Sequence, residues 1–224
     1  MSHHPVKLEC LDPATLNNDG VAWMLMGNSE EAIVSFKHAL TAMKTSLVRI
    51  PQSAVSDPRS STLYSSVDIP VCVDKYFLYS RVWVFPSYDG TIAEQDYPLF
   101  SSMILFNIAL VHHIRALEGS NEQALRDALF FYTVSLRIQA SVQPYLQKRV
   151  IAPIKLAALN NLAIIHYEQG EARKAHAILG EARALLSPSV VLVDGGDDKF
   201  NQDDFDGITL NAVMMKWTFA APCA

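Results

Sequence analysis

The sequence predicts a mainly α-helical protein of about three antiparallel helix pairs, with a small β-strand insertion between the first two pairs. The pattern of small and large residues between Leu16 and Leu40 returns between Lys155 and Leu186. A separate stretch, 71–86, is rich in β-branched and aromatic residues and is flanked by prolines, which is typical of a strand. The first observation predicts the helix pairs and the second predicts the insertion.

The two similar stretches align when their residue numbers differ by 143. A glycine between two helical runs is expected to adopt a positive φ and to end the first helix. Small residues are expected where the two helices cross, and a large residue fills the space beside the crossing. The aligned pairs are Leu16 with Leu159, Asn17 with Asn160, Asn18 with Asn161, Gly20 with Ala163, Gly27 with Gly170, Ala32 with Ala175, Phe36 with Leu179 and Ala39 with Ala182.

A third copy of the pattern lies between the other two, from Ser102 to Ile138. Asn107 and Ala109 match the first helix, and Ala128 matches the second. Ala109 and Ala128 are 19 residues apart, whereas the equivalent residues of the outer copies are 12 apart. We therefore expect a turn that is stretched by 7 residues in the middle copy.

This spacing of small and large residues resembles the tetratricopeptide repeat (TPR), a helix–turn–helix unit of about 34 residues. The resemblance implies that the pairs stack and that their first helices line a concave groove. Most of the chain also resembles a group of uncharacterised algal TPR-like proteins, and that resemblance implies no particular activity. It is carried by Leu16-Asn17-Asn18, Phe106-Asn107-Ile108-Ala109 and Ala220-Ala221-Pro222.

The chain divides into six stretches on these grounds. Asp12, Pro13 or Thr15 are expected to begin the first helix, because proline is well tolerated in a first turn. The stretches are a flexible N-terminus at 1–12, a first TPR-like unit at 13–48, an insertion of linker and strand at 49–98, a second unit with an extended turn at 99–141, a linker and third unit at 142–188, and an acidic loop with a C-terminal strand or helix at 189–224.

The insertion is expected to begin with a loop at 49–70, which is rich in proline, serine and threonine. The best strand within it is predicted from Tyr76 to Phe85. A lone strand needs a partner, and we expect that partner at Gly207–Met215, although this segment is also compatible with a short helix. Six aspartates between 194 and 206 predict a mobile acidic loop before it.

The composition is that of a folded protein, with 50% hydrophobic and 18% charged residues and a net charge of −5. This charge argues against nucleic-acid binding, which usually requires a basic face. Three widely spaced cysteines form no metal or disulfide pattern, and no apolar leader or membrane span is predicted. We expect a cytoplasmic protein, with a nuclear location left open, that needs no cofactor or metal and does not bind membranes.

Asparagine is the residue type that recurs in the first helices. Its amide both donates and accepts hydrogen bonds, so it can hold the backbone of an extended ligand; bonds between neighbouring helices are an equally good interpretation. We predict a groove that binds a peptide or a partner helix. Its predicted residues are Asn17, Asn18, Val21, Phe106, Asn107, Leu110, His113, Asn160, Asn161, Ile164 and Tyr167.

Known catalytic motifs are absent from the sequence, so the first hypothesis is a protein-interaction module or scaffold rather than an enzyme. The alternative is an enzyme or small-molecule-binding protein with a pocket between the strand insertion and the helices, near Tyr79, Trp83 and His113. Self-association through the apolar tail, Trp217–Ala224, is a third hypothesis.

Overall fold

The computed structural model describes residues 12–49, 64–71, 76–85, 92, 96–119, 121–142, 152–186 and 202–220. These ranges contain seven helices and one two-stranded sheet. The predicted class, mainly helical with a small β insertion, is therefore confirmed. The predicted flexible N-terminus lies outside the described residues up to position 11, as do all three cysteines and residues 187–201 of the predicted acidic loop.

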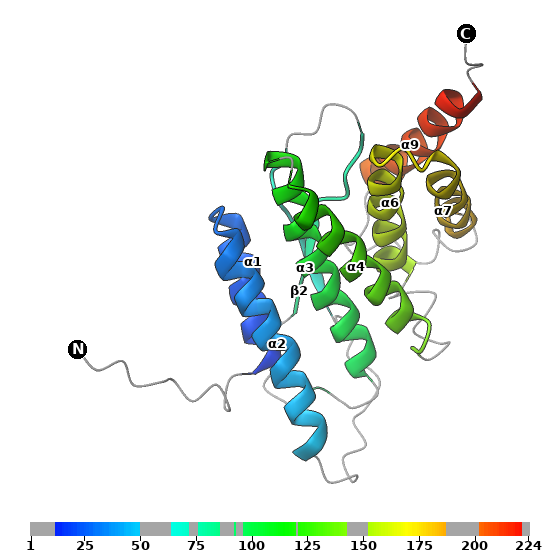
Figure 1. The fold of residues 1–224 in the computed structure, drawn as a ribbon. Helices are drawn as coiled ribbons and strands as arrows, with labels where there is room; N and C mark the ends of the chain where they lie inside the picture. The colour runs from blue at the N-terminus through cyan, green and yellow to red at the C-terminus, as the bar shows by residue number, and fades with distance from the viewer. Residues whose placement is uncertain are drawn as a thin grey trace.

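The helices pack as consecutive pairs that lie side by side along the molecule (Figure 1). Helix α1 packs on α2, α3 on α4, and α6 on α7, and the last helix, α9, packs on α7 and α6. Their bounds are α1 Pro13–Leu25, α2 Ser29–Arg49, α3 Tyr97–Gly119, α4 Glu122–Gln139, α6 Ala152–Glu168, α7 Ala172–Leu185 and α9 Gln202–Ala220.

The turns of the first and third pairs are built alike. Gly27 and Gly170 have φ values of 76° and 75°, in the left-handed region where a Cβ would be strained. The amide of the next residue then bonds back to the first helix in both turns, from Asn28 to the Trp23 carbonyl at 2.9 Å and from Glu171 to the His166 carbonyl at 2.8 Å. The predicted helix-ending role of both glycines is confirmed.

Small residues lie at the helix crossings, as the spacing predicts. Ala32, Ala128 and Ala175 are fully buried in the three second helices. A Cβ placed on Gly20 would lie 2.6 Å from the Phe36 ring, so α1 and α2 approach each other more closely than any larger residue would allow.

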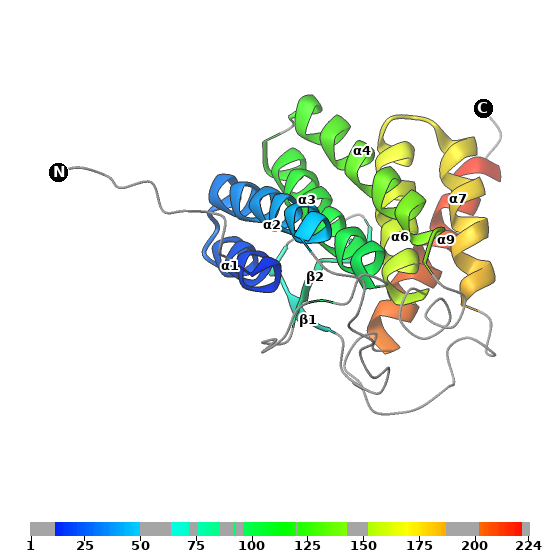
Figure 2. The same ribbon diagram turned by 90° about the horizontal axis from the view of Figure 1, so that it is seen from below.

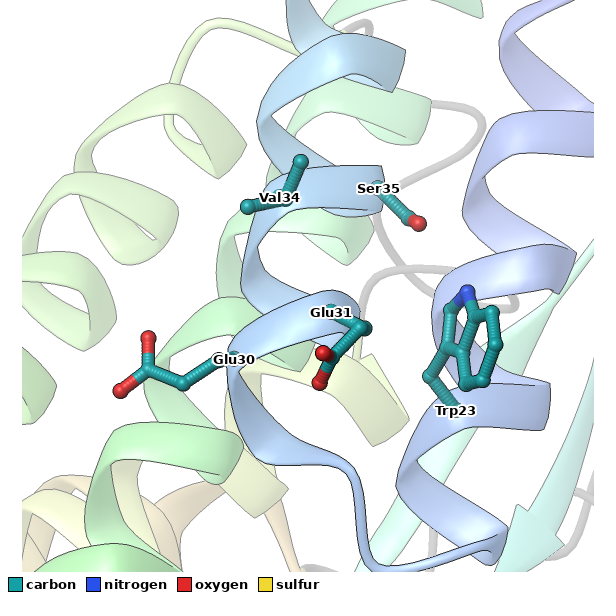
Figure 3. Close-up of a pocket in the computed structure, with 5 residues that line it drawn as sticks. All are labelled: Trp23, Glu30, Glu31, Val34 and Ser35. Carbon is teal, nitrogen blue, oxygen red and sulfur yellow. The ribbon is translucent and has the colours of Figure 1, made fainter. Parts of the chain in front are cut away.

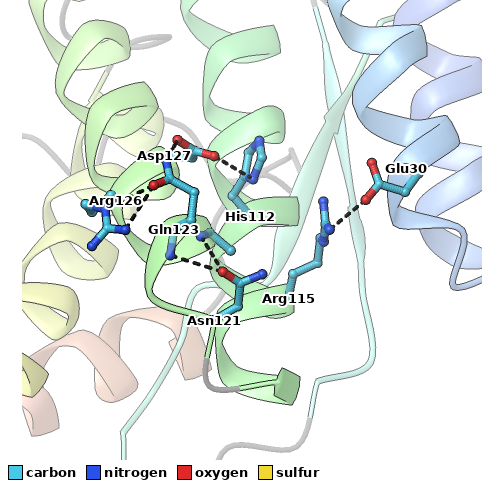
Figure 4. Close-up of polar contacts among 8 residues, drawn as sticks. Glu30, His112, Arg115, Asn121, Gln123, Arg126 and Asp127 are labelled. Atoms are coloured by element: carbon cyan, nitrogen blue, oxygen red, sulfur yellow. Dashed lines mark hydrogen bonds and ion pairs between the residues drawn. The ribbon is translucent and has the colours of Figure 1, made fainter.

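The middle pair differs from the prediction, because its 7 extra residues lengthen the helices instead of the turn. Helix α3 continues to Gly119 and α4 starts at Glu122, which adds about one turn to each. The Asn121 side chain caps α4 by accepting from the amides of Gln123 and Ala124 at 3.0 and 3.1 Å (Figure 4). Because this cap satisfies amides at the start of α4, the second helix can begin directly after a tight turn.

The two strands are β1, Ser65–Asp68, and β2, Arg81–Val84, which pair antiparallel with Ser65 opposite Val84. The strand partner was therefore predicted wrongly: it lies inside the stretch assigned to a loop. Short polar edge strands pair through their backbone and need no apolar alternation, so the serine-rich composition concealed β1.

Residues Gly207–Met215 are part of α9 and form no strand. The β-branched residues of this stretch suggested a strand, but β propensity depends on context. Asp203 and Asp204 begin the helix, where acids favour the positive end of the helix dipole. The last residues of the predicted self-association tail, 221–224, lie outside the described residues.

Helix α3 is the centre of the core. It is long and apolar enough to cross a membrane by length and composition, but 89% of its most apolar window is buried inside the fold. Packing against α2, α4 and β2 accounts for its apolar character. In the view of Figure 2 the two strands lie beside the first helices α1 and α3, on the side away from α2 and α4.

Candidate functional site

The first helices present asparagine side chains to an extended segment of the same chain, residues 77–85, which we call the held segment. The central contact is made by Asn107 on α3. Its Oδ1 accepts from the Trp83 amide at 2.9 Å, and its Nδ2 donates to the Trp83 carbonyl at 2.8 Å. Asn17 on α1 donates to the same carbonyl at 2.9 Å, and Asn107 also donates to Asn17 Oδ1 at 3.1 Å.

Asn18, next to Asn17 on α1, holds the residue two positions further along. Its Nδ2 donates to the Phe85 carbonyl at 2.7 Å, and its Oδ1 accepts from the Phe85 amide at 3.0 Å. Asn17, Asn18 and Asn107 together form what we call the N-terminal clamp. It satisfies both backbone polar groups of Trp83 and Phe85, which are a buried pair with one residue between them.

The same arrangement recurs at the other end of the held segment. Asn211 on α9 accepts from the Phe77 amide at 3.0 Å and donates to the Phe77 carbonyl at 2.7 Å. Asn160 on α6 donates to that carbonyl at 3.0 Å, and Asn211 donates to Asn160 Oδ1 at 2.8 Å. Asn161 accepts from the Tyr79 amide and donates to the Tyr79 carbonyl, both at 2.9 Å.

Asn160, Asn161 and Asn211 form the C-terminal clamp, and each of its bonds to the backbone has a counterpart in the N-terminal clamp. Even the bond between neighbouring asparagines recurs, at 3.3 Å from Asn17 to Asn18 and at 3.1 Å from Asn160 to Asn161. Because every amide meets both an N–H and a C=O group, its orientation is fixed by the bonds. The two clamps are thus one device used twice.

Each clamp holds an aromatic-x-aromatic tripeptide, Phe77-Leu78-Tyr79 or Trp83-Val84-Phe85. Between them, Arg81 lies in β2 and its guanidinium pairs with Asp68 at 2.8 Å and with Asp204 of α9 at 3.3 Å. The Asp204 side chain is only 8% exposed, and partial burial strengthens the attraction between the two charges. The held segment therefore has two clamped ends and an ion-paired centre.

Aromatic packing fills the space between the clamps. The Trp83 ring lies edge-on to Tyr64 with centroids 5.2 Å apart and stacks on Tyr79 at 5.9 Å. Phe106 of α3 contacts both Tyr79 and Trp83 edge-on, at 6.0 and 6.1 Å. Tyr132 of α4 packs on Phe106 at 5.4 Å. Such edge-on and offset pairs are the favoured geometries of aromatic rings.

The tyrosines and histidine of this core are held in their neutral forms. Tyr132 Oη receives a bond from Asn161 at 2.9 Å, and burial raises the pKa of Tyr132. Burial likewise raises the pKa of Tyr79 and lowers the pKa of His113 to about 3. The His113 ring nitrogens have no hydrogen-bond partner among the described residues, which makes a charged imidazole costly there.

Of the eleven residues predicted for the groove, the five asparagines hydrogen-bond to the held segment and Phe106 packs on its aromatic rings. His113 lies edge-on to Tyr132 with centroids 6.0 Å apart. The asparagines bond to one another between neighbouring helices, as one of the two interpretations predicts, and to the backbone of the held segment. That segment is part of the same chain, which the sequence did not reveal, and the binding of a separate ligand stays a prediction. Val21, Leu110 and Ile164 are buried, and Tyr167 lies edge-on to Tyr76 at 5.5 Å.

Three site residues were missed by the sequence analysis. Asn211 was assigned to a possible strand, although the run Leu210-Asn211-Ala212 has the asparagine-and-alanine signal of the other first helices. Gly207, one turn earlier, lets the Phe77 ring approach, because a Cβ there would lie 2.1 Å from the ring. Tyr132, whose hydroxyl accepts from Asn161 at 2.9 Å, was not among the predicted site residues.

The space proposed for an enzyme-like pocket is filled. Tyr79, Trp83 and His113 are completely buried. Two surface hollows lie elsewhere: one of about 260 Å³ beside Trp23, Glu30 and Glu31 (Figure 3) and one of about 440 Å³ at 170–174. Among the described residues there is no group of three His, Cys, Asp or Glu side chains placed to hold a metal.

Two further histidines, His112 and His166, lie in the first helices α3 and α6 and contact side chains of the following segments. His112 stacks on Phe131 with centroids 5.7 Å apart and lies 3.8 Å from Asp127 (Figure 4). His166 Nδ1 is 2.6 Å from Glu171. Comparison with known proteins adds nothing to this geometry, because no family model, curated protein or solved structure matches the chain.

Proposed function

We propose that the protein is a TPR-like interaction module whose concave face binds an extended peptide through its backbone. The observation that carries the proposal is the pair of equivalent asparagine clamps, each of which holds the backbone of two alternate residues of the held segment. Arg81–Val84 of this segment pair with β1, and six side-chain amides from four helices bond to the backbone of Phe77, Tyr79, Trp83 and Phe85.

The held segment is the basis of our proposal for the ligand that the face would prefer. Hydrogen bonds from the asparagine side chains to a peptide backbone do not depend on the peptide's sequence. Selectivity must therefore come from the side chains of the bound peptide. Phe77 requires the space above Gly207, Phe85 packs edge-on to Phe100 with centroids 4.6 Å apart, and Arg81 meets Asp204. We propose ligands with two aromatic-x-aromatic motifs on either side of a basic residue.

The held segment then acts as an internal competitor of a partner's segment. It has the advantage of being part of the same chain, because a tethered ligand binds at a high effective concentration. A partner gains access when the held segment leaves the clamps. The module would therefore exist in a self-bound state, which the structure describes, and a partner-bound state.

An exchange experiment tests this function in the full chain. Protease sites are inserted at 52–62 and 87–95, and the folded protein is cut at both, so that the held segment stays in place without a covalent link. A fluorescent peptide with the sequence of residues 64–85 is then added in excess and followed by anisotropy. We expect slow uptake that the unlabelled peptide competes, and no uptake by the uncut protein.

Asn107→Ala in the cut protein is expected to weaken the uptake at least tenfold, because both backbone groups of Trp83 lose a partner. The matched control is Asn121→Ala, which removes an asparagine that bonds only within its own turn. A cut protein that keeps its helical circular dichroism but takes up no peptide would show that the face is not a peptide site.

A further inference from the structure

The helices that hold the two ends of the held segment differ in how they are anchored to the rest of the fold. At the N-terminal clamp, α1 packs on α2, and Gly20 brings it into close contact with the Phe36 ring. The buried apolar side chains of α1 include Leu16, Val21 and Met24. Helix α1 therefore has apolar anchoring of its own, in addition to its hydrogen bonds to the held segment.

Helix α9, at the C-terminal clamp, has less apolar anchoring. It lies at one end of the molecule, against α7 and α6 (Figure 1, Figure 2). Among the described side chains of α9, the buried apolar ones are Ile208 and Met215. Ile208 belongs to a small cluster that is separate from the main core, with Leu156, Leu159 and Ala182.

One side of α9 rests on the held segment. Asn211 bonds to the amide and the carbonyl of Phe77, the Phe77 ring lies directly on Gly207, and Asp204 pairs with Arg81 at 3.3 Å. Asp204, Gly207 and Asn211 follow one another at intervals of three and four residues, so they lie on the same side of the helix. The held segment thus supplies much of the surface on which α9 docks.

Departure of the held segment would remove this surface. Asn211 is 0% exposed and would keep its bond to Asn160, but it would lose both bonds to Phe77. A buried amide that loses its partners favours a state in which water replaces them. Loss of the Phe77 ring would also leave the backbone at Gly207 without its apolar contact. The docking of α9 and the occupation of the C-terminal clamp therefore favour each other, and such a coupling is reciprocal.

We propose that α9 is a strap over the C-terminal end of the held segment. It docks while Phe77 and Tyr79 occupy the C-terminal clamp, and it detaches when they leave, while α1, α3 and α6 stay in place. As a route of peptide exchange this inference rests on the proposed function, because the strap would open before a partner's segment replaces the held one. The docking of α9 on the chain's own segment involves no added peptide, so it can be tested separately.

The first test is hydrogen exchange of the full chain without peptide, measured by mass spectrometry. Phe77→Ala removes the ring that lies on Gly207, and we expect the amides of α9 to exchange at least about tenfold faster than in the natural chain, with α6 and α7 unchanged. The matched control is Phe85→Ala, which removes the ring that packs on Phe100 at the other end of the segment. In this variant α1 should stay protected to within about twofold, because α2 anchors it.

Three results of this test would overturn the proposal. The first is unchanged protection of α9 in Phe77→Ala. The second is faster exchange throughout α1–α7 in that variant, because α9 would then open only together with the whole fold. The third is an α1 that opens in Phe85→Ala as readily as α9 opens in Phe77→Ala.

The second test weakens the strap and observes the segment. Ile208→Ala removes an apolar anchor of α9, and by reciprocity the amides of Phe77 and Tyr79 should exchange at least about fivefold faster, whereas those at the N-terminal clamp keep their rates. The matched control is Val213→Ala, because Val213 lies on the same helix and is 46% exposed. It should change none of these rates, and unchanged rates in Ile208→Ala would contradict the strap.

Peptide uptake by the cut protein separates this inference from the proposed function. We expect Ile208→Ala to speed the uptake of the fluorescent peptide, because a weaker strap opens more often. If the cut natural protein takes up no peptide, the proposed function fails, and the strap is still judged by the exchange rates of α9. If peptide is taken up but Ile208→Ala leaves both the uptake and the exchange rates unchanged, the strap fails and the proposed function stands.

Discussion

At the scale of single residues, the side-chain amide determines how this fold is held together. An asparagine in an apolar helix must find a donor and an acceptor, because an unpaired buried polar group is costly. Six asparagines meet that requirement on the backbone of the held segment and on one another. The asparagine columns could be predicted from the sequence, because they recur at a fixed place in the repeat. Their ligand could not, since a loop closes back on the helices without leaving a periodic pattern.

The buried and the half-buried asparagines should differ in their contribution to stability. Asn107→Ala leaves the buried Trp83 amide without a partner, and we expect a loss of about 3 kcal/mol in the free energy of unfolding. Asn18 is partly exposed, so water replaces its bonds to Phe85, and Asn18→Ala should cost about 1 kcal/mol. Urea denaturation measures both. Equal losses would contradict the role assigned to burial.

His113 should make the protein sensitive to acid. Burial lowers its pKa to about 3 in the folded state, compared with about 6.5 in the unfolded chain. Protons therefore bind the unfolded chain more readily below pH 6.5. The stability contributed by the neutral ring is full above pH 6.5 and is lost as the pH falls toward 3, by up to about 1.4 kcal/mol per pH unit.

The measurement is the free energy of unfolding of the natural protein and of His113→Phe between pH 7.5 and 4. We expect the two to be similar near neutral pH and the variant to lose less stability on acidification. Parallel curves for the two proteins would show that His113 does not titrate as its burial requires.

At the scale of elements, the close contact between paired helices was the most predictable feature. Gly20 and Phe36 in the first pair correspond to Ala163 and Leu179 in the third. Where the small residue of the crossing is alanine instead of glycine, the large residue beside it is leucine instead of phenylalanine. The strand pairing was less predictable, because β1 is short and polar. For the segment that forms α9 the sequence left a strand and a short helix both open, because its β-branched residues favour a strand and the acids before them favour the start of a helix.

Gly20→Ala should destabilise the protein by about 1–3 kcal/mol, because the new methyl group would overlap the Phe36 ring. Adding Phe36→Leu should restore much of the loss, since it recreates the pairing found in the third unit. Gly180→Ala is the matched control: a Cβ there meets nothing within 4 Å, and alanine favours a helix by about 1 kcal/mol. Thermal melts of all three variants decide. Destabilisation by Gly180→Ala as large as that by Gly20→Ala would contradict the account.

At the scale of the whole molecule, two equivalent clamps place one extended segment across four first helices. The first and last described helices, α1 and α9, are therefore connected through their hydrogen bonds to the same segment, although they lie far apart in sequence. The helix pairs were predictable from their internal repeat. The path of the held segment was not, because it depends on contacts between residues as distant as Phe77 and Asn211.

The most direct test of the central claim is hydrogen exchange of individual backbone amides, followed by NMR. The amides of Phe77, Tyr79, Trp83 and Phe85 each donate to an asparagine side chain. We expect them to exchange as slowly as amides in the middle of α3, and we expect Asn107→Ala to release the Trp83 amide selectively. Exchange of these four amides at the rate of an unstructured peptide would contradict the account.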